Sequence, residues 1–177
     1  MWLDDANKTQ PPEGSQMTKQ ITFSLNGRAV SAELDPHRTL LDVLRADHAL
    51  HGPKYGCGMA QCGACMVLVD GQPARACVMK VARVAKRAVT TLEGLAQPNG
   101  TLHPVQQGFV DRQGAQCGYC LNGMVIGAVA LLAKNADPDE AEIRHALRDN
   151  LCRCGTHQEI IAAVRRAAVI MKETSDV

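Results

Sequence analysis

The chain has 177 residues, of which 46% are hydrophobic, 21% charged and 3% aromatic, and its formal net charge at pH 7 is +1. This length suits one ordinary domain or two small ones, and the composition is typical of a folded chain. A charge so close to zero excludes a strongly basic nucleic-acid binder as the default. The longest apolar run, 124–133, is far shorter than the roughly 18 residues of a membrane span. We therefore expect neither a nucleic-acid partner nor a direct membrane span.

The first part of the chain predicts a small, mostly β unit with one helix packed on it. Residues 1–16 are polar and predict a disordered tail, without the apolar segment of a secretory signal. Alternating apolar residues predict a hairpin around Asn26-Gly27, and Thr39 is a candidate helix cap. The expected elements are strands at 20–25 and 28–34, a helix at 40–46, a loop rich in Gly and Cys at 52–65, and strands at 66–69, 75–78 and 89–92.

The second part predicts helices. A linker is expected at 97–102, where Pro, Asn and Gly separate two patterned regions, and Asp137 with Glu140 has the spacing of a capping box. The expected helices are 104–113, 120–134, 138–148 and 156–171, of which the second is apolar nearly all round and should be buried. The fold class is therefore α+β, with one domain at 17–96, a four-helix domain at 103–172 and a short tail at 173–177.

The cysteines are the strongest functional signal. All eight fall into two groups of four, which are Cys57, Cys62, Cys65 and Cys77, and Cys117, Cys120, Cys152 and Cys154. Eight in 177 residues is fewer than a secreted disulfide scaffold has, and no secretory signal is visible. Thiolates are soft ligands that suit zinc, copper(I) or iron–sulfur clusters. The grouping therefore predicts two metal centres rather than disulfides.

The first group has the Cys-x4-Cys-x2-Cys…Cys spacing of the plant-type [2Fe–2S] ferredoxins. The chain has to wrap closely around such a cluster, and Gly56, Gly58 and Gly63 are expected to supply the positive φ angles for this. Backbone N–H groups freed there can point at the sulfurs, and Cys77 is expected on the returning strand at 75–78. A zinc ribbon, which usually has two Cys-x2-Cys pairs, and a redox dithiol, which leaves two cysteines of the group unexplained, are the weaker alternatives.

The second group flanks the predicted helices. Cys117 and Cys120 come at the start of the apolar helix, and Cys152 and Cys154 just before the last one. Cysteines two residues apart do not share a helix face, so Cys152 and Cys154 have to lie in a non-helical turn. The partial positive charge at helix N-termini stabilises thiolates there. Helices that converge on one cluster would also explain a fold with few aromatic residues, because metal–ligand bonds replace part of a core.

Four motifs together resemble the small iron–sulfur subunit of the molybdenum hydroxylases, the xanthine dehydrogenase/oxidase family. The motifs are Gly56-Cys57-Gly58, Cys62-Gly63-Ala64-Cys65, Gln116-Cys117-Gly118-Tyr119-Cys120 and Asn150-Leu151-Cys152-Arg153-Cys154-Gly155. The resemblance covers 19–171. The turn Gly155-Thr156-His157 is more similar to the nicotinate, isoquinoline and aldehyde dehydrogenase branch than to the eukaryotic xanthine enzymes.

This resemblance implies a plant-type ferredoxin-like (β-grasp) domain followed by a four-helix domain, each with one [2Fe–2S] cluster. It also implies a large partner subunit with molybdopterin, which hydroxylates an N-heterocycle such as nicotinate or isoquinoline, or an aldehyde, with oxygen from water. Electrons would pass from molybdenum to the helical-domain cluster, to the ferredoxin-like cluster, and on to FAD or to haem c of a cytochrome c subunit. Gln116 matches the family glutamine that hydrogen-bonds the molybdopterin.

The expected function is electron transfer in a heteromeric oxidoreductase, with no catalytic residue in this chain. A stand-alone [2Fe–2S] carrier or redox sensor is the alternative, and a structural zinc protein is a third possibility. Arg153 is expected to favour the reduced cluster or to be an ordinary surface arginine, and Tyr119 to pack over the cluster or simply against the fold. The expected compartment is the cytoplasm, or the periplasmic face of the inner membrane if an exported partner carries the chain.

Overall fold

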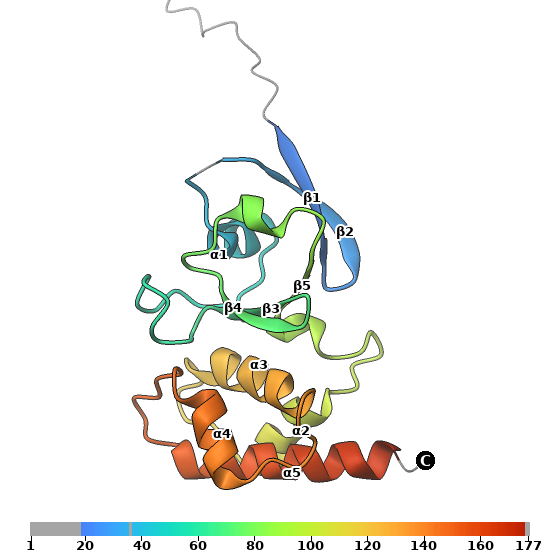
Figure 1. Cartoon of the computed structure of the whole chain (residues 1–177), viewed down its shortest axis with the longest axis vertical. Helices are drawn as coiled ribbons and strands as arrows, with labels where there is room; N and C mark the ends of the chain where they lie inside the picture. Colours follow the sequence, from blue (N-terminus) through green and yellow to red (C-terminus); the bar gives the residue numbers. More distant parts are fainter. Residues whose placement is uncertain (1–18, 36, 176–177) are drawn as a thin grey trace, which may run out of the picture.

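The computed structural model describes residues 19–35 and 37–175. The predicted tail at 1–16 and the last two residues of the predicted tail at 173–177 lie outside these residues. Figure 1 shows a sheet with a short helix at one end of the molecule and a layer of helices at the other. We call these parts the sheet half and the helical half. The arrangement confirms the α+β fold class.

The sheet half consists of five strands in the order β2-β1-β5-β3-β4. Strands β1 and β5 run parallel, and the other neighbours run antiparallel. The hairpin of β1 and β2 turns at Asn26 and Gly27, which both have positive φ angles and suit a tight turn. The strands are β1 (Gln20–Leu25), β2 (Arg28–Glu33), β3 (Met66–Val69), β4 (Gln72–Arg75) and β5 (Ala88–Thr90).

The returning strand lies earlier in the chain than the predicted range of 75–78. Asp70 and Gly71 form a two-residue turn with positive φ angles, and Val69 pairs directly with Gln72, so β4 starts at once. Pro73 lies within β4, which the sheet tolerates because β4 is an edge strand. Cys77 therefore lies in the turn that follows β4 and not on a strand.

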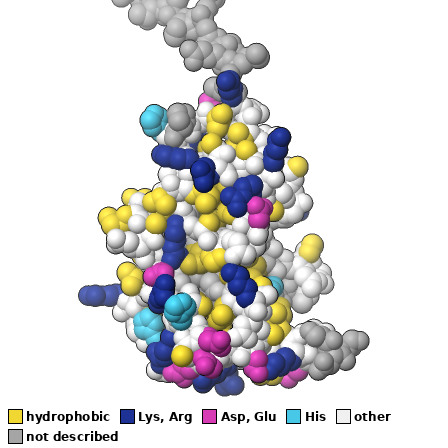
Figure 2. Space-filling model, in the orientation of Figure 1, with side chains coloured by type: hydrophobic (Ala, Val, Ile, Leu, Met, Phe, Trp, Pro, Cys, Tyr) yellow, Lys and Arg dark blue, Asp and Glu magenta, His cyan; other side chains and the backbone are white. Residues whose placement is uncertain are grey.

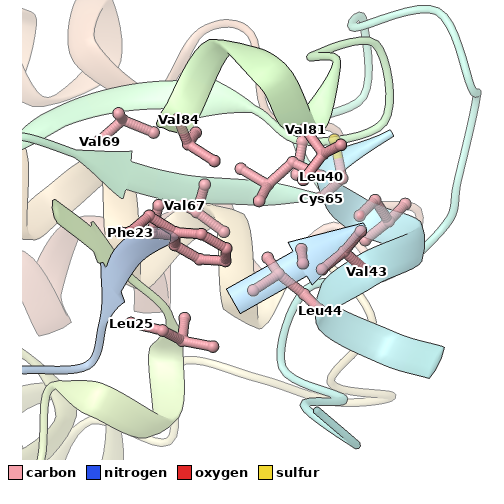
Figure 3. Close-up of a cluster of buried hydrophobic side chains, with 14 of the residues drawn as sticks. Phe23, Leu25, Leu40, Val43, Leu44, Cys65, Val67, Val69, Val81 and Val84 are labelled. Carbon is pink, nitrogen blue, oxygen red and sulfur yellow. The ribbon is translucent and has the colours of Figure 1, made fainter. Parts of the chain in front are cut away.

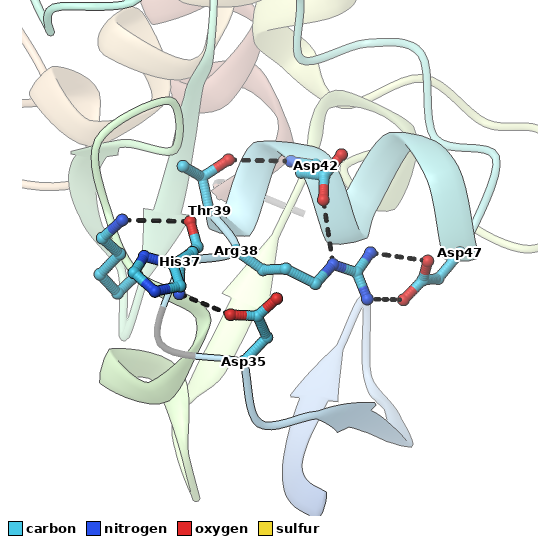
Figure 4. A network of polar contacts seen from close by, with 7 residues as sticks. Asp35, His37, Arg38, Thr39, Asp42 and Asp47 are labelled. Carbon is cyan, nitrogen blue, oxygen red and sulfur yellow. Dashed lines mark hydrogen bonds and ion pairs between the residues drawn. The ribbon is translucent and has the colours of Figure 1, made fainter. Parts of the chain in front are cut away.

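The helix of the sheet half starts as predicted and then widens. Thr39 caps α1 (Leu40–Asp42) by accepting a hydrogen bond from the Asp42 N–H at 3.2 Å, and the chain continues as a π-helix, η1 (Val43–Asp47). Figure 4 shows how Arg38 braces both segments through Asp42 and Asp47. The guanidinium of Arg38 lies 2.9 Å from Asp42 and 2.8 Å from Asp47, and it lowers the pKa of Asp47. Short 3-10 turns, η2 (Val81–Val84) and η3 (Leu92–Gly94), flank β5.

The core of the sheet half is formed where α1 and η1 pack on β1 and β3. Figure 3 shows Phe23, Leu40, Leu44 and Val67 gathered in this core. Cys65 belongs to the same buried cluster and is only 1% exposed. The sheet half thus buries one member of the first cysteine group in its own apolar interior.

The helical half consists of α2 (Pro104–Asp111), α3 (Leu121–Leu132), α4 (Glu140–Leu147) and α5 (His157–Ser175). Helix α3 lies between the sheet and the other helices and is buried nearly all round, as predicted (Figure 1). In α5, Ile160, Val164 and Ala168 are buried on the face that the sequence predicts. This helix continues to Ser175, beyond its predicted end near 171.

The start of α4 differs from the prediction. The capping box consists of Asp139 and Glu142, with hydrogen bonds of 2.8 Å in both directions, and not of Asp137 and Glu140. Both pairs have the same spacing, so the pattern alone does not choose between them. Asp137 instead forms an ion pair of 2.9 Å with Lys172 of α5.

The two halves share a third, smaller core. Met66 and Leu68 of β3 pack there against Ile126 and Ala130 of α3, and all four side chains are buried. The sheet thus buries one face on α1 and η1 and the other on α3. The domain limits that the sequence predicts, with a linker at 97–102, stay a prediction.

Candidate metal centres

The loop before β3 wraps around the sulfur of Cys57. The backbone N–H groups of Gln61, Met59 and Cys62 donate hydrogen bonds to Cys57 Sγ at 3.2, 3.4 and 3.4 Å. The hydrogen bonds from Met59 and Cys62 lower the pKa of the Cys57 thiol to about 6. The N–H of Cys57 in turn donates to Cys62 Sγ at 3.3 Å. The loop is thus built to hold sulfur in its anionic form, although these donors are N–H groups of other loop residues and not, as the sequence predicts, those of the three glycines.

The three glycines of this loop serve two different requirements. Gly58 and Gly63 have φ angles of +70° and +80°, as predicted. For Gly56 the prediction of a positive φ is wrong, since its φ lies outside the left-handed region. A Cβ atom at Gly56 would stand 2.5 Å from Cys62 Sγ, so this glycine is required for space beside the sulfur.

The other two members of the first group lie deeper. Cys65 and Cys77 are buried, and their thiols contact each other. Burial raises the pKa of the Cys65 thiol to about 11. Near neutral pH such a thiol stays protonated unless a cation takes the place of the proton, which is what a metal centre supplies.

The second group gathers where two helices begin. Cys120 is the N-cap residue of α3, and Cys152 and Cys154 lie in the non-helical segment before α5, as predicted. Burial raises the pKa of Cys120 to about 12. Burial also opposes ionisation of Cys152, but hydrogen bonds from the side chain and backbone of Thr156 outweigh it and lower the pKa of Cys152 to about 7. The Thr156 hydroxyl lies 3.3 Å from Cys152 Sγ.

In both groups the thiols are arranged as pairs. The thiols of Cys57 and Cys62 interact, as do those of Cys65 and Cys77; the pairs in the second group are Cys117 with Cys154 and Cys120 with Cys152. Over the residues that the structure describes, no three His, Cys, Asp or Glu side chains gather as a site for a single metal ion. Two pairs of thiols suit a centre with two irons better than a mononuclear zinc site. All eight cysteines are free, so no disulfide competes for them.

The two groups face one shared cavity. It measures about 170 Å³, and its walls include Cys57 and Cys62 from the first group and Cys117, Cys120 and Cys152 from the second. Tyr119 lines it and donates a hydrogen bond from its hydroxyl to the carbonyl of Tyr55, which closes the sheet half onto the helical half. The two predicted metal centres are therefore neighbours.

The surface around this cavity is apolar and exposed. Tyr55, Met59, Tyr119 and Leu151 are each more than half exposed, at 64%, 61%, 51% and 65%. Figure 2 shows hydrophobic side chains gathered along the left edge of the molecule, at the level of the loop 52–65. Exposed apolar residues that gather in one place mark interaction sites. We call these four residues the apolar rim.

Two polar residues that the sequence singles out lie at the same place. Gln116, which precedes Cys117, is exposed, and so is Arg153, which lines the cavity between Cys152 and Cys154. Sequence reasoning named Thr156 and Asn150 only within larger motifs, without a role at the site, and it missed Asn122. Asn122 is a lone amide in an apolar helix and is fully buried, which is the one signal that could have drawn attention to it.

Comparison with known proteins agrees with this geometry. Residues 23–96 match the family model of the 2Fe-2S iron-sulfur cluster binding domain, and residues 91–165 match that of the [2Fe-2S] binding domain. The chain is 53% identical over 152 residues to a nicotinate dehydrogenase subunit of Pseudomonas putida, covering 86% of this chain and 96% of that protein. It is 44% identical to the alpha subunit of isoquinoline 1-oxidoreductase of Brevundimonas diminuta, covering 84% of this chain and 97% of that protein.

A solved structure agrees as well. Quinoline 2-oxidoreductase from Pseudomonas putida 86 matches with a TM-score of 0.82 and 33% identity, over 88% of this chain and 96% of that one. The chain therefore belongs to the small [2Fe–2S] subunits of the molybdenum hydroxylase family, which transfer electrons. Relatives that are subunits fit this function and not the alternative of a stand-alone carrier. In the part of the chain that the structure describes, no helix has the length and hydropathy to cross a bilayer.

Proposed function

We propose that Cys57, Cys62, Cys65 and Cys77 hold one [2Fe–2S] cluster and that Cys117, Cys120, Cys152 and Cys154 hold the other. The pairing of the thiols within each group is the observation that carries this assignment, and five of the eight cysteines line one cavity. Each cluster, when bound, takes up and releases one electron at a time. The chain itself supplies N–H donors at Cys57, a hydroxyl at Cys152 and an apolar enclosure at Cys65.

The apolar rim and Gln116 form the docking face for a large molybdopterin-binding subunit. The rim is exposed next to both thiol groups, and Gln116 is exposed one residue before Cys117 of the second group. Since the family glutamine contacts the molybdopterin, electrons enter this chain at the helical half. They leave from the sheet half, to a subunit that carries FAD or to a cytochrome c subunit.

The substrate of the complex is an N-heterocycle, with nicotinate as the first candidate. The 53% identity to a nicotinate dehydrogenase subunit supports this choice. Isoquinoline and aldehydes are the further candidates, since relatives at 44% and 39% identity are named for them. The compartment is that of the large subunit, because this chain docks on it: the cytoplasm, or the periplasmic face of the inner membrane if the partner is exported.

The test replaces Cys120 by Ser in the purified complex. Iron should fall by about half, from about four to about two irons per chain, because only the second site loses a thiolate. Reduction of an external electron acceptor by nicotinate should slow strongly, because electrons no longer leave the molybdenum site through this chain. Iron analysis and the rate of acceptor reduction are the measurements. A variant that loses this iron but keeps the parental rate contradicts the relay.

Assays of the parent complex with nicotinate, isoquinoline and an aldehyde decide the substrate. The largest kcat/KM should be found with nicotinate. A larger value with the aldehyde would contradict the proposed substrate and leave the relay intact.

The matched control for the Cys120 variant is Val169→Ser on the exposed face of α5, which should keep both the iron and the rate.

A further inference from the structure

A buried amide ties the two halves together next to the metal centres. Asn122 is fully buried in the first turn of α3, two residues after Cys120. Its side-chain amide donates hydrogen bonds to the carbonyl oxygens of Ala64 and Met66, at 2.9 and 2.8 Å. These residues flank Cys65, so one side chain of the helical half holds the backbone on both sides of a thiol in the sheet half.

This amide is costly to bury. Its Oδ1 atom has no hydrogen-bond partner among the residues that the structure describes. An unsatisfied buried acceptor destabilises a fold, and the rest of the helix interior is apolar or glycine. Packing alone would favour an apolar side chain here. The two donated hydrogen bonds are therefore the reason for an amide at this position.

The backbones of the two halves also pack closely around a second amide, that of Asn150. Asn150 lies two residues before Cys152, and a Cβ atom at Gly63 would stand 2.0 Å from its Oδ1 atom. A Cβ atom at Gly123 would stand 2.4 Å from the carbonyl oxygen of Gly63. Neither glycine has room for a side chain. The cysteine loop of the sheet half thus touches both cysteine segments of the helical half.

Further hydrogen bonds complete the contact. The guanidinium of Arg75, at the end of β4, donates to the carbonyl oxygen of Asp149 at 2.9 Å and to Asn150 Oδ1 at 3.5 Å. The N–H of Leu151 donates to the carbonyl oxygen of Cys62 at 3.0 Å. Every one of these bonds is made within three residues of a predicted iron ligand.

We propose that Asn122, Asn150 and Arg75 form a clasp that sets the distance and orientation between the two cluster sites. This inference rests on the proposed function of the two thiol groups as cluster sites. The rate of electron transfer between two centres falls steeply with their distance, so a gap that opens by an ångström slows the relay. The clasp residues are positioning residues and bind no iron themselves.

The test compares the parent with the Asn122→Ala variant, each as the full chain with both clusters. Both proteins are reduced with dithionite, and their electron paramagnetic resonance spectra are recorded at low temperature. In the parent, the two neighbouring paramagnetic centres should split each other's signals. In the variant this splitting should be lost, while iron content and the signals of each cluster at higher temperature stay parental. A parent that holds far fewer than about four irons per chain would instead refute the proposed function itself.

A second variant keeps the test decisive if Asn122→Ala fails to fold. Arg75→Met removes two hydrogen bonds between the halves at a partly exposed position and should also reduce the splitting. Arg87→Met is the matched control, because Arg87 forms its ion pair with Asp70 inside the sheet half. Parental splitting in loaded Asn122→Ala or Arg75→Met, no splitting in the parent, or equal loss in Arg87→Met would each overturn the clasp.

Discussion

Single atoms decide whether the first thiol group can hold its cluster. Gly56 has an ordinary backbone conformation, yet there is no room for a Cβ atom beside Cys62 Sγ. Gly71 is the opposite case, because its φ is +74° and a Cβ atom there would meet nothing within 4 Å. The two glycines therefore separate a requirement for space at the sulfur from a requirement for backbone freedom.

Gly56→Ala should reduce the iron content by about half, from about four to about two irons per chain, while the free energy of unfolding without iron changes little. The reason is that only the sulfur of Cys62 has to move. Gly71→Ala should keep all the iron but lose about 1–2 kcal/mol of stability through backbone strain. Iron analysis and urea unfolding measure both quantities. Full iron in Gly56→Ala would contradict this account.

Helix ends carry the next level of organisation, and α2 begins on an unusual cap. His103 Nδ1 accepts a hydrogen bond from the Val105 N–H at 3.1 Å, and Gln106 accepts one from the His103 N–H at 3.0 Å. From the sequence, only Pro104 in the first turn indicates that a helix begins here. Histidine is not among the preferred N-cap residues, so the sequence does not predict that His103 caps this helix. Burial lowers the pKa of His103, because the interior disfavours the charged ring.

This cap should make the stability of the chain depend on pH. A protonated ring accepts no bond at Nδ1, so the folded state binds a proton less readily than the unfolded chain. The stabilisation is complete above the unfolded pKa of about 6.5 and is lost as the pH falls through the lower folded pKa. His103→Asn keeps a cap that does not titrate. As the pH is lowered from about 7 to about 5, the melting temperature of the variant should therefore rise relative to that of the parent. A difference in melting temperature that does not change with pH would contradict the titration of His103.

The assembly as a whole depends on the core between β3 and α3. Ile126 is fully buried there against residues of the sheet, so the two halves are not independent. Helix α3 lies directly on the sheet, without an intervening segment (Figure 1), and apolar side chains of both elements pack in one buried cluster. Both halves should accordingly unfold together in the parent protein.

Ile126→Ala should lower the free energy of unfolding by about 2–5 kcal/mol, through lost burial and the cavity that remains. Val169→Ala, at a side chain that is 45% exposed on α5, should change it by less than about 0.5 kcal/mol. Urea unfolding followed by circular dichroism and by the visible absorption of the clusters is the measurement. An Ile126 variant as stable as its control would show that the core between β3 and α3 does not stabilise the fold.

Local pattern predicts much of this molecule. The alternation in 20–25, the short apolar run in 66–69 and the long apolar run in 120–134 predict β1, β3 and α3, because burial on one face or all round leaves a pattern in neighbouring residues. The same pattern errs where two local solutions compete. Asp137 and Asp139 both offer a capping box, and the contact of Asp137 with Lys172 lies far along the chain.

The cysteine spacing and the glycines around it are enough to predict the first thiol group, since neighbouring residues wrap a plant-type cluster, and the remaining four cysteines form the second. Folding alone decides that the thiols form pairs, that members of both groups line one cavity, and that Asn122 reaches across to Ala64 and Met66. These contacts join segments that are distant in the chain. No periodicity or spacing records such a contact, because it exists only once α3 has packed on β3.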